Sequence, residues 1–278
     1  MRMIDKKNTL NELETISRRI RGRIIEISHH SKTLHLGSSL SCVDILVALY
    51  WGIMNIDPSN VSNPERNRFI LSKGHAATAL YAVLELKGLL KDDLLSSYAI
   101  DGESLPEHPT LGCAPGVEVV SGSLGHGLSL GLGMALAGKI RDHKYLNFVL
   151  MSDGKCNEGS VWEAAMLAPA IGVDNLVAIV DYNKWQATGR SNKITSLAPL
   201  DKKWEAFGWS TYEVDGHNTS ELLGILQNIP DSSSKPVAII ANTIKGKGVS
   251  FMEDDNNWHY RIPTSDEVEE AFKELGLT

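Results

Sequence analysis

Two apolar runs with a helical segment between them constrain the fold of this chain more than any other feature. Residues 146–151 and residues 175–181 are each apolar and long enough to form one buried strand. The pattern over 158–171, between them, predicts a helix. A right-handed crossover through such a helix sets the two strands side by side and parallel. The sequence therefore predicts a βαβ unit within a parallel sheet.

Polar residues follow both predicted strands. Asp153 and Gly154 come after the first strand, and Asn183 comes after the second. Parallel strands end at the same edge of a sheet, so we expect these residues to lie together at the carboxyl edge. Their oxygens are hard ligands that suit Mg²⁺ together with diphosphate oxygens and water. The spacing predicts a metal-diphosphate site, although Asp-Gly after a strand is also typical of ordinary turns.

The rest of the chain repeats the alternation of helices and strands. Apolar residues recur at helical spacing from Leu13 to Ile27, which predicts a first helix. This alternation favours an α/β fold in which helices cover both faces of one parallel sheet. We expect a single domain over 1–278, beginning with a helical segment. The predicted helices besides 158–171 are 10–28, 43–51, 78–87, 124–139 and 220–227, and the other strands are 69–71, 209–214 and 237–241.

Composition limits the class of protein. The net charge of −7 gives no reason to propose nucleic-acid binding, and no run reaches the roughly 18 apolar residues of a membrane span. Residues 1–7 are polar, unlike an export signal. The cysteines are odd in number and lack metal-ligand spacing, so we expect buried free thiols in a reducing cytoplasm. They are Cys42, Cys113 and Cys156.

A glycine-rich turn, 121–127, precedes the predicted helix 124–139. A turn of this kind that leads into a helix brings backbone N–H groups and the positive end of the helix dipole close to an anion. The glycines inside the helix are more simply explained by close packing of the helix. These are Gly131, Gly133 and Gly138.

The stretches 152–165, 174–176 and 181–186 together resemble the thiamine-diphosphate signature of the transketolase family. The resemblance implies the family's thiamine-diphosphate-binding fold, the PP domain. It implies that Mg²⁺ is bound by Asp153, Asn183 and the backbone carbonyl of Trp185.

The same resemblance extends to cofactor contacts. Gly154 belongs to the signature itself. The turn at 121–127 is similar to the family's glycine-leucine-glycine loop, which implies that Gly122 and Leu124 contact the cofactor through their backbone.

Four histidines stand in segments similar to those of the family: 33–37, 71–76, 105–109 and 257–259. Thiamine diphosphate supplies the electron sink, and the protein supplies orientation and proton transfer. Imidazoles that titrate near neutral pH suit the proton transfers of carbon-carbon bond chemistry. The resemblance implies that His75 and His259 lie near the diphosphate, and that His35 and His108 lie near substrate oxygens.

Two further residues carry competing interpretations. Lys245 is expected at the same rim as the histidines, but a solvated lysine is the alternative. Glu158 matches a family glutamate that joins a proton relay between cofactor sites, and a helix-capping or interface carboxylate is the alternative.

Several positions depart from the family's pattern, and they leave substrate preference open. They are Leu34 and Leu36 around His35, His126 in the glycine-rich turn, and Ser152 and Lys155 beside Asp153.

The resemblance matches only the amino-terminal portion of full-length transketolases. In the family a second domain holds the aminopyrimidine ring and supplies the glutamate that protonates it. The chain therefore resembles the amino-terminal subunit of a split transketolase, which needs a carboxy-terminal partner subunit. We expect an α2β2 assembly that uses thiamine diphosphate and Mg²⁺ to transfer a two-carbon ketol unit from a ketose, or ketose phosphate, to an aldose.

Other functions remain open at this point. The chain could belong to another thiamine-diphosphate enzyme, similar either to deoxyxylulose-phosphate synthase or to the E1 component of a dehydrogenase. It could also be a catalytically silent regulatory subunit, but such a chain is expected to have lost Asp153 or Asn183, and both are present.

Overall fold

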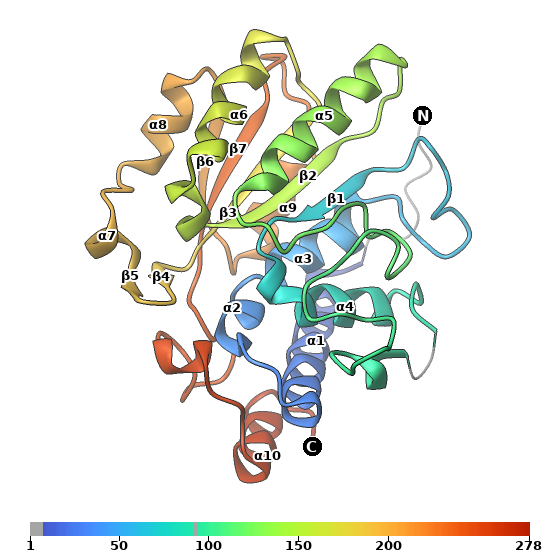
Figure 1. Ribbon diagram of the computed structural model, residues 1–278, viewed down its shortest axis with the longest axis vertical. Coiled ribbons are helices and arrows are strands. Elements are labelled where there is room, and N and C mark those ends of the chain that lie inside the picture. Colours follow the sequence, from blue (N-terminus) through green and yellow to red (C-terminus); the bar gives the residue numbers. More distant parts are fainter. Residues whose placement is uncertain (1–7, 92–93) are drawn as a thin grey trace.

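A five-stranded parallel sheet forms the centre of the computed structural model, which describes residues 8–91 and 94–278 (Figure 1). The strand order is β1-β2-β3-β7-β6, and every neighbouring pair is parallel. All five predicted strands are present, which confirms the parallel sheet. Their bounds are β1 Arg68–Leu71, β2 Asn147–Ser152, β3 Leu176–Tyr182, β6 Ser210–Asp215 and β7 Val237–Asn242.

Helices pack on both faces of this sheet. Figure 1 shows α5, α6 and α8 together in the upper part of the view, and α1 to α4 in the lower part. The α-helices are α1 Leu10–Ser31, α2 Leu36–Ser41, α3 Val43–Val47, α4 Ala77–Leu86, α5 His126–Ile140, α6 Gly159–Ala170, α7 Ser191–Ile194, α8 Leu200–Ala206, α9 Thr219–Leu226 and α10 Ser265–Glu274.

The two faces arise from the alternation of side chains along each strand. In β2, Phe148 and Leu150 belong to a core shared with α1, α3, α4 and α9. Val149 and Met151 belong to a second core shared with α5, α6 and α8. All six residues of β2 are buried, as expected for a central strand covered on both sides.

The predicted helix at 43–51 is wrong in its extent. The structure divides this stretch into α3 and a π-helical turn, Ala48–Ile53, and adds α2 just before it. Six residues without a repeating apolar pattern form α2, so periodicity does not reveal it. In contrast, α10 has a capping box between Thr264 and Glu267, a signal that the sequence does contain.

The helix α5 lies very close to the sheet. A Cβ at Gly131 would lie 2.5 Å from Val149 Cγ2, and one at Gly138 would lie 2.9 Å from the Tyr145 ring, so the packing interpretation holds for both. It is wrong for Gly133, since a Cβ there would meet nothing within 4 Å.

Three further expectations concern residues 1–7, membrane-spanning helices and the cysteines. The polar segment 1–7 lies outside the described residues. In the part that the structure describes, no helix is both long and apolar enough to cross a bilayer. The three cysteines are free; Cys42 and Cys156 are buried, but Cys113 is only half-buried.

Candidate functional site

The ends of β2 and β3 bring the predicted metal ligands to one edge of the sheet. Ser152 is paired with Asp181 in the register of these strands. Asp153 follows the first of these residues, and Asn183 lies two positions after the second. Both side chains are buried, with exposed fractions of 0% for Asp153 and 2% for Asn183.

Asp153 is a buried carboxylate that forms no ion pair with any of the described residues. Its Oδ1 accepts a hydrogen bond from the Gly154 N–H at 2.8 Å, and its Oδ2 accepts one from the Lys184 N–H at 3.0 Å. Burial raises the pKa of Asp153 to about 6, and the negative charge of Asp181 adds to this effect. A desolvated carboxylate without a cationic partner fits a divalent cation.

The amide of Asn183 is oriented by its neighbours. Its Oδ1 accepts from the Trp185 N–H at 3.1 Å, and its Nδ2 lies 3.4 Å from Asp181 Oδ2. Trp185 begins a small hairpin, β4 Trp185–Gln186 with β5 Gly189–Arg190. Its indole is fixed by the Arg190 guanidinium, 3.8 Å from the ring centroid, and by a hydrogen bond to Asp254 at 2.8 Å.

A metal ion at this site would need donor atoms other than those of acidic and imidazole side chains. The described residues contain no group of three His, Cys, Asp or Glu that could hold a metal ion. The donors that fit are one carboxylate, one amide oxygen and one backbone carbonyl, with the remaining positions left for ligand oxygens and water.

Sequence reasoning missed the residue that ties this edge together. Asp181 is fully buried and accepts hydrogen bonds from Ser41, Lys73 and Thr243. Burial opposes its charge, but the Lys73 ammonium outweighs this and lowers the pKa of Asp181. These contacts join β3 to α2 and to the segments after β1 and β7. The sequence did contain a signal for this network. Polar residues directly follow two of the predicted strands, with Lys73 after 69–71 and Thr243 after 237–241.

Three of the predicted histidines converge. The ring centroids of His35 and His259 are 4.8 Å apart, those of His35 and His75 are 5.3 Å apart, and those of His75 and His259 are 5.9 Å apart. A backbone hydrogen bond holds two of these residues together, because the His35 N–H donates to the His259 carbonyl at 3.0 Å. His35 has a φ of 69°, which turns the chain into α2. Their roles in catalysis remain predictions.

The expectation that these imidazoles titrate near neutral pH is wrong for the chain alone. Burial lowers the pKa of His259 to about 3, and Lys245 adds to the effect. Burial, followed by the charge of Lys73, holds the pKa of His75 well below its usual value, and burial also lowers the pKa of His35. Burial thus favours the uncharged form of all three rings.

Lys245 is not a solvated lysine. It is 1% exposed, and its Nζ donates to Asn256 Oδ1 at 2.7 Å and to His259 Nδ1 at 3.2 Å. Burial lowers the pKa of Lys245 to about 8, and Lys73 contributes in the same direction. The ammonium therefore lies beneath the histidine cluster rather than in bulk water.

A cavity of about 440 Å³ brings the other predicted residues together. Glu158 lies at its wall in the N-cap position of α6 but makes no capping hydrogen bond, so the capping interpretation is not supported. Asp153 and Lys245 are buried behind the walls. The predicted residues that line the cavity are His35, His75, His108, Gly122, Leu124, Gly154, Glu158, Asn183, Trp185 and His259, together with the unusual Lys155.

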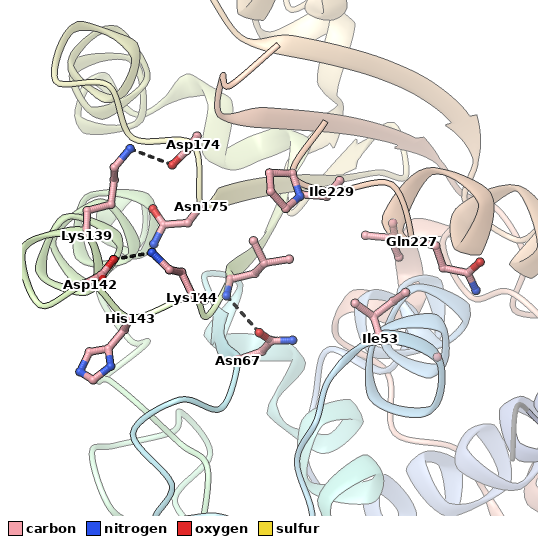
Figure 2. Close-up of a pocket in the computed structure, with 14 residues that line it drawn as sticks. Ile53, Asn67, Lys139, Asp142, His143, Lys144, Asp174, Asn175, Gln227 and Ile229 are labelled. Atoms are coloured by element: carbon pink, nitrogen blue, oxygen red, sulfur yellow. Dashed lines mark hydrogen bonds and ion pairs between the residues drawn. The ribbon is translucent and has the colours of Figure 1, made fainter. Parts of the chain in front are cut away.

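A larger cavity, of about 680 Å³, lies at the opposite edge of the sheet, where β2 and β3 begin. Figure 2 shows its charged side chains engaged with one another, in the pairs Lys139 with Asp174 and Lys144 with Asp142. It contains none of the predicted site residues. The candidate site is therefore chosen by the buried carboxylate without a cationic partner and by the histidine cluster, not by cavity size.

The chain is similar to known proteins over most of its length. The family described as "Transketolase, thiamine diphosphate binding domain" matches residues 14–278. The chain is 41% identical over 263 residues to an apulose-4-phosphate transketolase subunit of Phocaeicola vulgatus, covering 95% of this chain and 93% of that protein. It is 44% identical over 219 residues to the 6-deoxy-6-sulfo-D-fructose transketolase subunit SqwG of a Clostridium species, covering 79% and 80%.

Solved structures show the same similarity. The transketolase of Campylobacter jejuni superposes with a TM-score of 0.91 at 26% identity, and that of Leishmania mexicana with a TM-score of 0.88 at 25% identity. The matches cover 97% and 95% of this chain, but only 43% and 41% of those chains. The chain therefore spans about two fifths of the length of these structures.

Proposed function

The chain belongs to the transketolase family, and from this premise we propose that it is the amino-terminal, diphosphate-binding subunit of a split transketolase. The proposed activity is transfer of a two-carbon ketol unit from a phosphorylated ketose to an aldose, with thiamine diphosphate and Mg²⁺. One observation carries the proposal: a buried unpaired carboxylate, an oriented amide and three converging imidazoles surround one cavity.

The donor set supports the assignment of the metal. Asp153, Asn183 Oδ1 and the Trp185 carbonyl are proposed to hold Mg²⁺, which neutralises the carboxylate that burial now penalises. His75, His259 and Lys245 are proposed to face the diphosphate, since burial lowers the pKa of each and an anion would stabilise their charged forms. The backbones of Gly122, Leu124 and Gly154 complete this wall.

The sugar substrate is proposed to bind in the same cavity, next to the cofactor. Bound thiamine diphosphate supplies the electron sink for breaking and forming the carbon-carbon bond. His35 and His108 line the cavity and are proposed to exchange protons with sugar hydroxyls. Glu158 lies at the wall and is proposed to join a proton relay toward a second cofactor site.

The proposed partner is a carboxy-terminal subunit that carries the pyrimidine-binding domain. Relatives of nearly the same length are named as subunits, and solved transketolases extend well beyond this chain. We propose that residues 1–278 form one diphosphate-binding domain and that the partner closes the remaining part of the cavity. The free cysteines support the proposed cytoplasmic location.

Self-association in an α2β2 assembly is supported by an apolar surface. The helices α5 and α6 pack against each other (Figure 1). Both expose large apolar side chains on their outer faces. The exposed fractions are 41% for Leu130, 59% for Met166 and 49% for Leu167. Clusters of exposed apolar side chains are typical of association surfaces, so a second copy of this chain is proposed to cover this one.

One experiment tests activity and assembly together. The chain is mixed with its partner subunit, thiamine diphosphate and Mg²⁺, and ketol transfer from a ketose phosphate to an aldose is followed alongside sedimentation of the mixture. We expect transfer that requires both chains and a mass of two copies of each. Decarboxylation of pyruvate without ketol transfer would contradict the proposal and favour another thiamine-diphosphate enzyme.

A further inference from the structure

The segment after β7, residues 243–248, is held by side chains that have no other part in the site. The Ile244 N–H donates to His217 Nε2 at 2.9 Å. The Lys247 carbonyl accepts from Arg21 Nε, also at 2.9 Å. Lys245 lies between these two fixed points, so its backbone is restrained on both sides.

The two nitrogens of His217 have different and fixed roles. A backbone N–H can only donate, so Nε2 must be the unprotonated acceptor for Ile244. Nδ1 then carries the proton and donates to Asp44 Oδ2 at 2.8 Å. This carboxylate therefore selects the tautomer of His217 that Ile244 requires.

Asp44 is itself fixed by Arg21. The guanidinium contacts both carboxylate oxygens, Nη1 to Oδ1 at 3.1 Å and Nη2 to Oδ2 at 2.6 Å. Burial opposes a charge on Asp44, but the positive charge of Arg21 and the hydrogen bonds from His217 and Arg21 keep its pKa well below the usual range. The network thus joins α1, α3 and the segment after β6 to the segment after β7.

We propose that His217 is a positioning residue, which through Asp44 and the Ile244 N–H holds Lys245 beneath His259. The inference rests on the proposed function, because it takes Lys245 and His259 to face the cofactor diphosphate. Lys245 Nζ donates to His259 Nδ1 at 3.2 Å, so we expect a displacement of the backbone at Ile244 to disturb the contact between the ammonium and the ring. Small displacements of residues that contact a cofactor alter cofactor binding and catalysis.

The test compares three variants of the full chain. His217→Leu keeps a similar volume but makes neither hydrogen bond, His217→Gln keeps an amide that can accept and donate, and His143→Leu is the control. His143 forms an ion pair with Glu65 and lines the cavity at the opposite edge of the sheet from the site. Thermal melting first shows whether each variant is folded, and variants that melt like the wild type are then used.

Hydrogen exchange without cofactor reports on positioning alone. His217→Leu is expected to increase exchange at 244–247 about ten-fold, whereas His143→Leu leaves it unchanged. In the assembly with the partner subunit, the apparent KM for thiamine diphosphate should rise about ten-fold in His217→Leu, while the KM for the sugar stays within about two-fold. His217→Gln should recover part of both effects.

The outcomes separate the two proposals. Unchanged exchange at 244–247 and unchanged cofactor KM in folded His217→Leu would overturn the positioning role. If the wild-type assembly binds no thiamine diphosphate, the proposed function fails, and the exchange experiment still decides whether His217 holds this segment.

Discussion

At the scale of single residues, burial acts in opposite directions on the acids and bases around the cavity. It raises the pKa of Asp153 to about 6, and it lowers the pKa of Lys245 to about 8 and that of His259 to about 3. Burial therefore destabilises the charged form of each group. A divalent cation beside the acid and an anion beside the two bases would reverse all three penalties, which is the charge pattern of a magnesium diphosphate.

Replacement of Asp153 by Asn tests this electrostatic pattern. Between pH 4 and 6 the folded chain keeps a proton on Asp153 that the unfolded chain has released, so stability falls as pH rises. Asp153→Asn lacks this titration. The unfolding free energy of the variant minus that of the wild type should therefore increase by up to about 3 kcal/mol from pH 4 to pH 7.

Denaturant unfolding without metal measures this difference, and the exposed Asp101→Asn is the control. The same Asp153→Asn chain, assembled with its partner, should lose Mg²⁺-dependent binding of thiamine diphosphate. A difference that does not vary with pH, or unchanged binding, would contradict the assigned role of Asp153.

At the scale of elements, the sequence predicts the strands better than the helices. Every central strand is buried on both faces, so its residues form a continuous apolar run that is visible without tertiary information. The short α2 has no such signature, and it forms because it packs against the segments that carry Lys73 and His259. Tertiary contacts, which sequence periodicity does not report, determine it.

The site residues, like the helices and strands, were predicted from the sequence only in part. Asp153, Asn183 and the histidines follow strands or stand in family motifs, and the structure brings them to one cavity. Asp181 and His217 were missed because their importance depends on partners such as Lys73 and Asp44, which are distant in sequence. Buried networks of this kind become visible only when the fold is known.

Glycines of α5 give a prediction at this scale. Gly131→Ala should destabilise the chain by about 1–3 kcal/mol, because the new methyl group would lie 2.5 Å from Val149 Cγ2. Gly133→Ala, where nothing lies within 4 Å, should be neutral or stabilising by up to about 1 kcal/mol. Urea unfolding of both variants decides the point, and equal effects would contradict the proposed packing of α5.

At the scale of the whole molecule, the proposed function depends on an incomplete cavity. The chain supplies a wall at the carboxyl ends of β1, β2 and β3, and solved relatives are more than twice as long. The exposed apolar side chains of α5 and α6 give a further surface for the proposed association. Function therefore belongs, in this proposal, to an assembly and not to the isolated chain.

The central claim is that Asp153 and Asn183 hold the metal of a bound thiamine diphosphate. The most direct measurement is an anomalous difference map from crystals of the assembly grown with the cofactor and Mn²⁺, which prefers the same oxygen ligands. We expect one strong peak about 2.2 Å from oxygens of Asp153, Asn183 and Trp185 and from the diphosphate. A cofactor bound with its metal anywhere else in the assembly would contradict the claim.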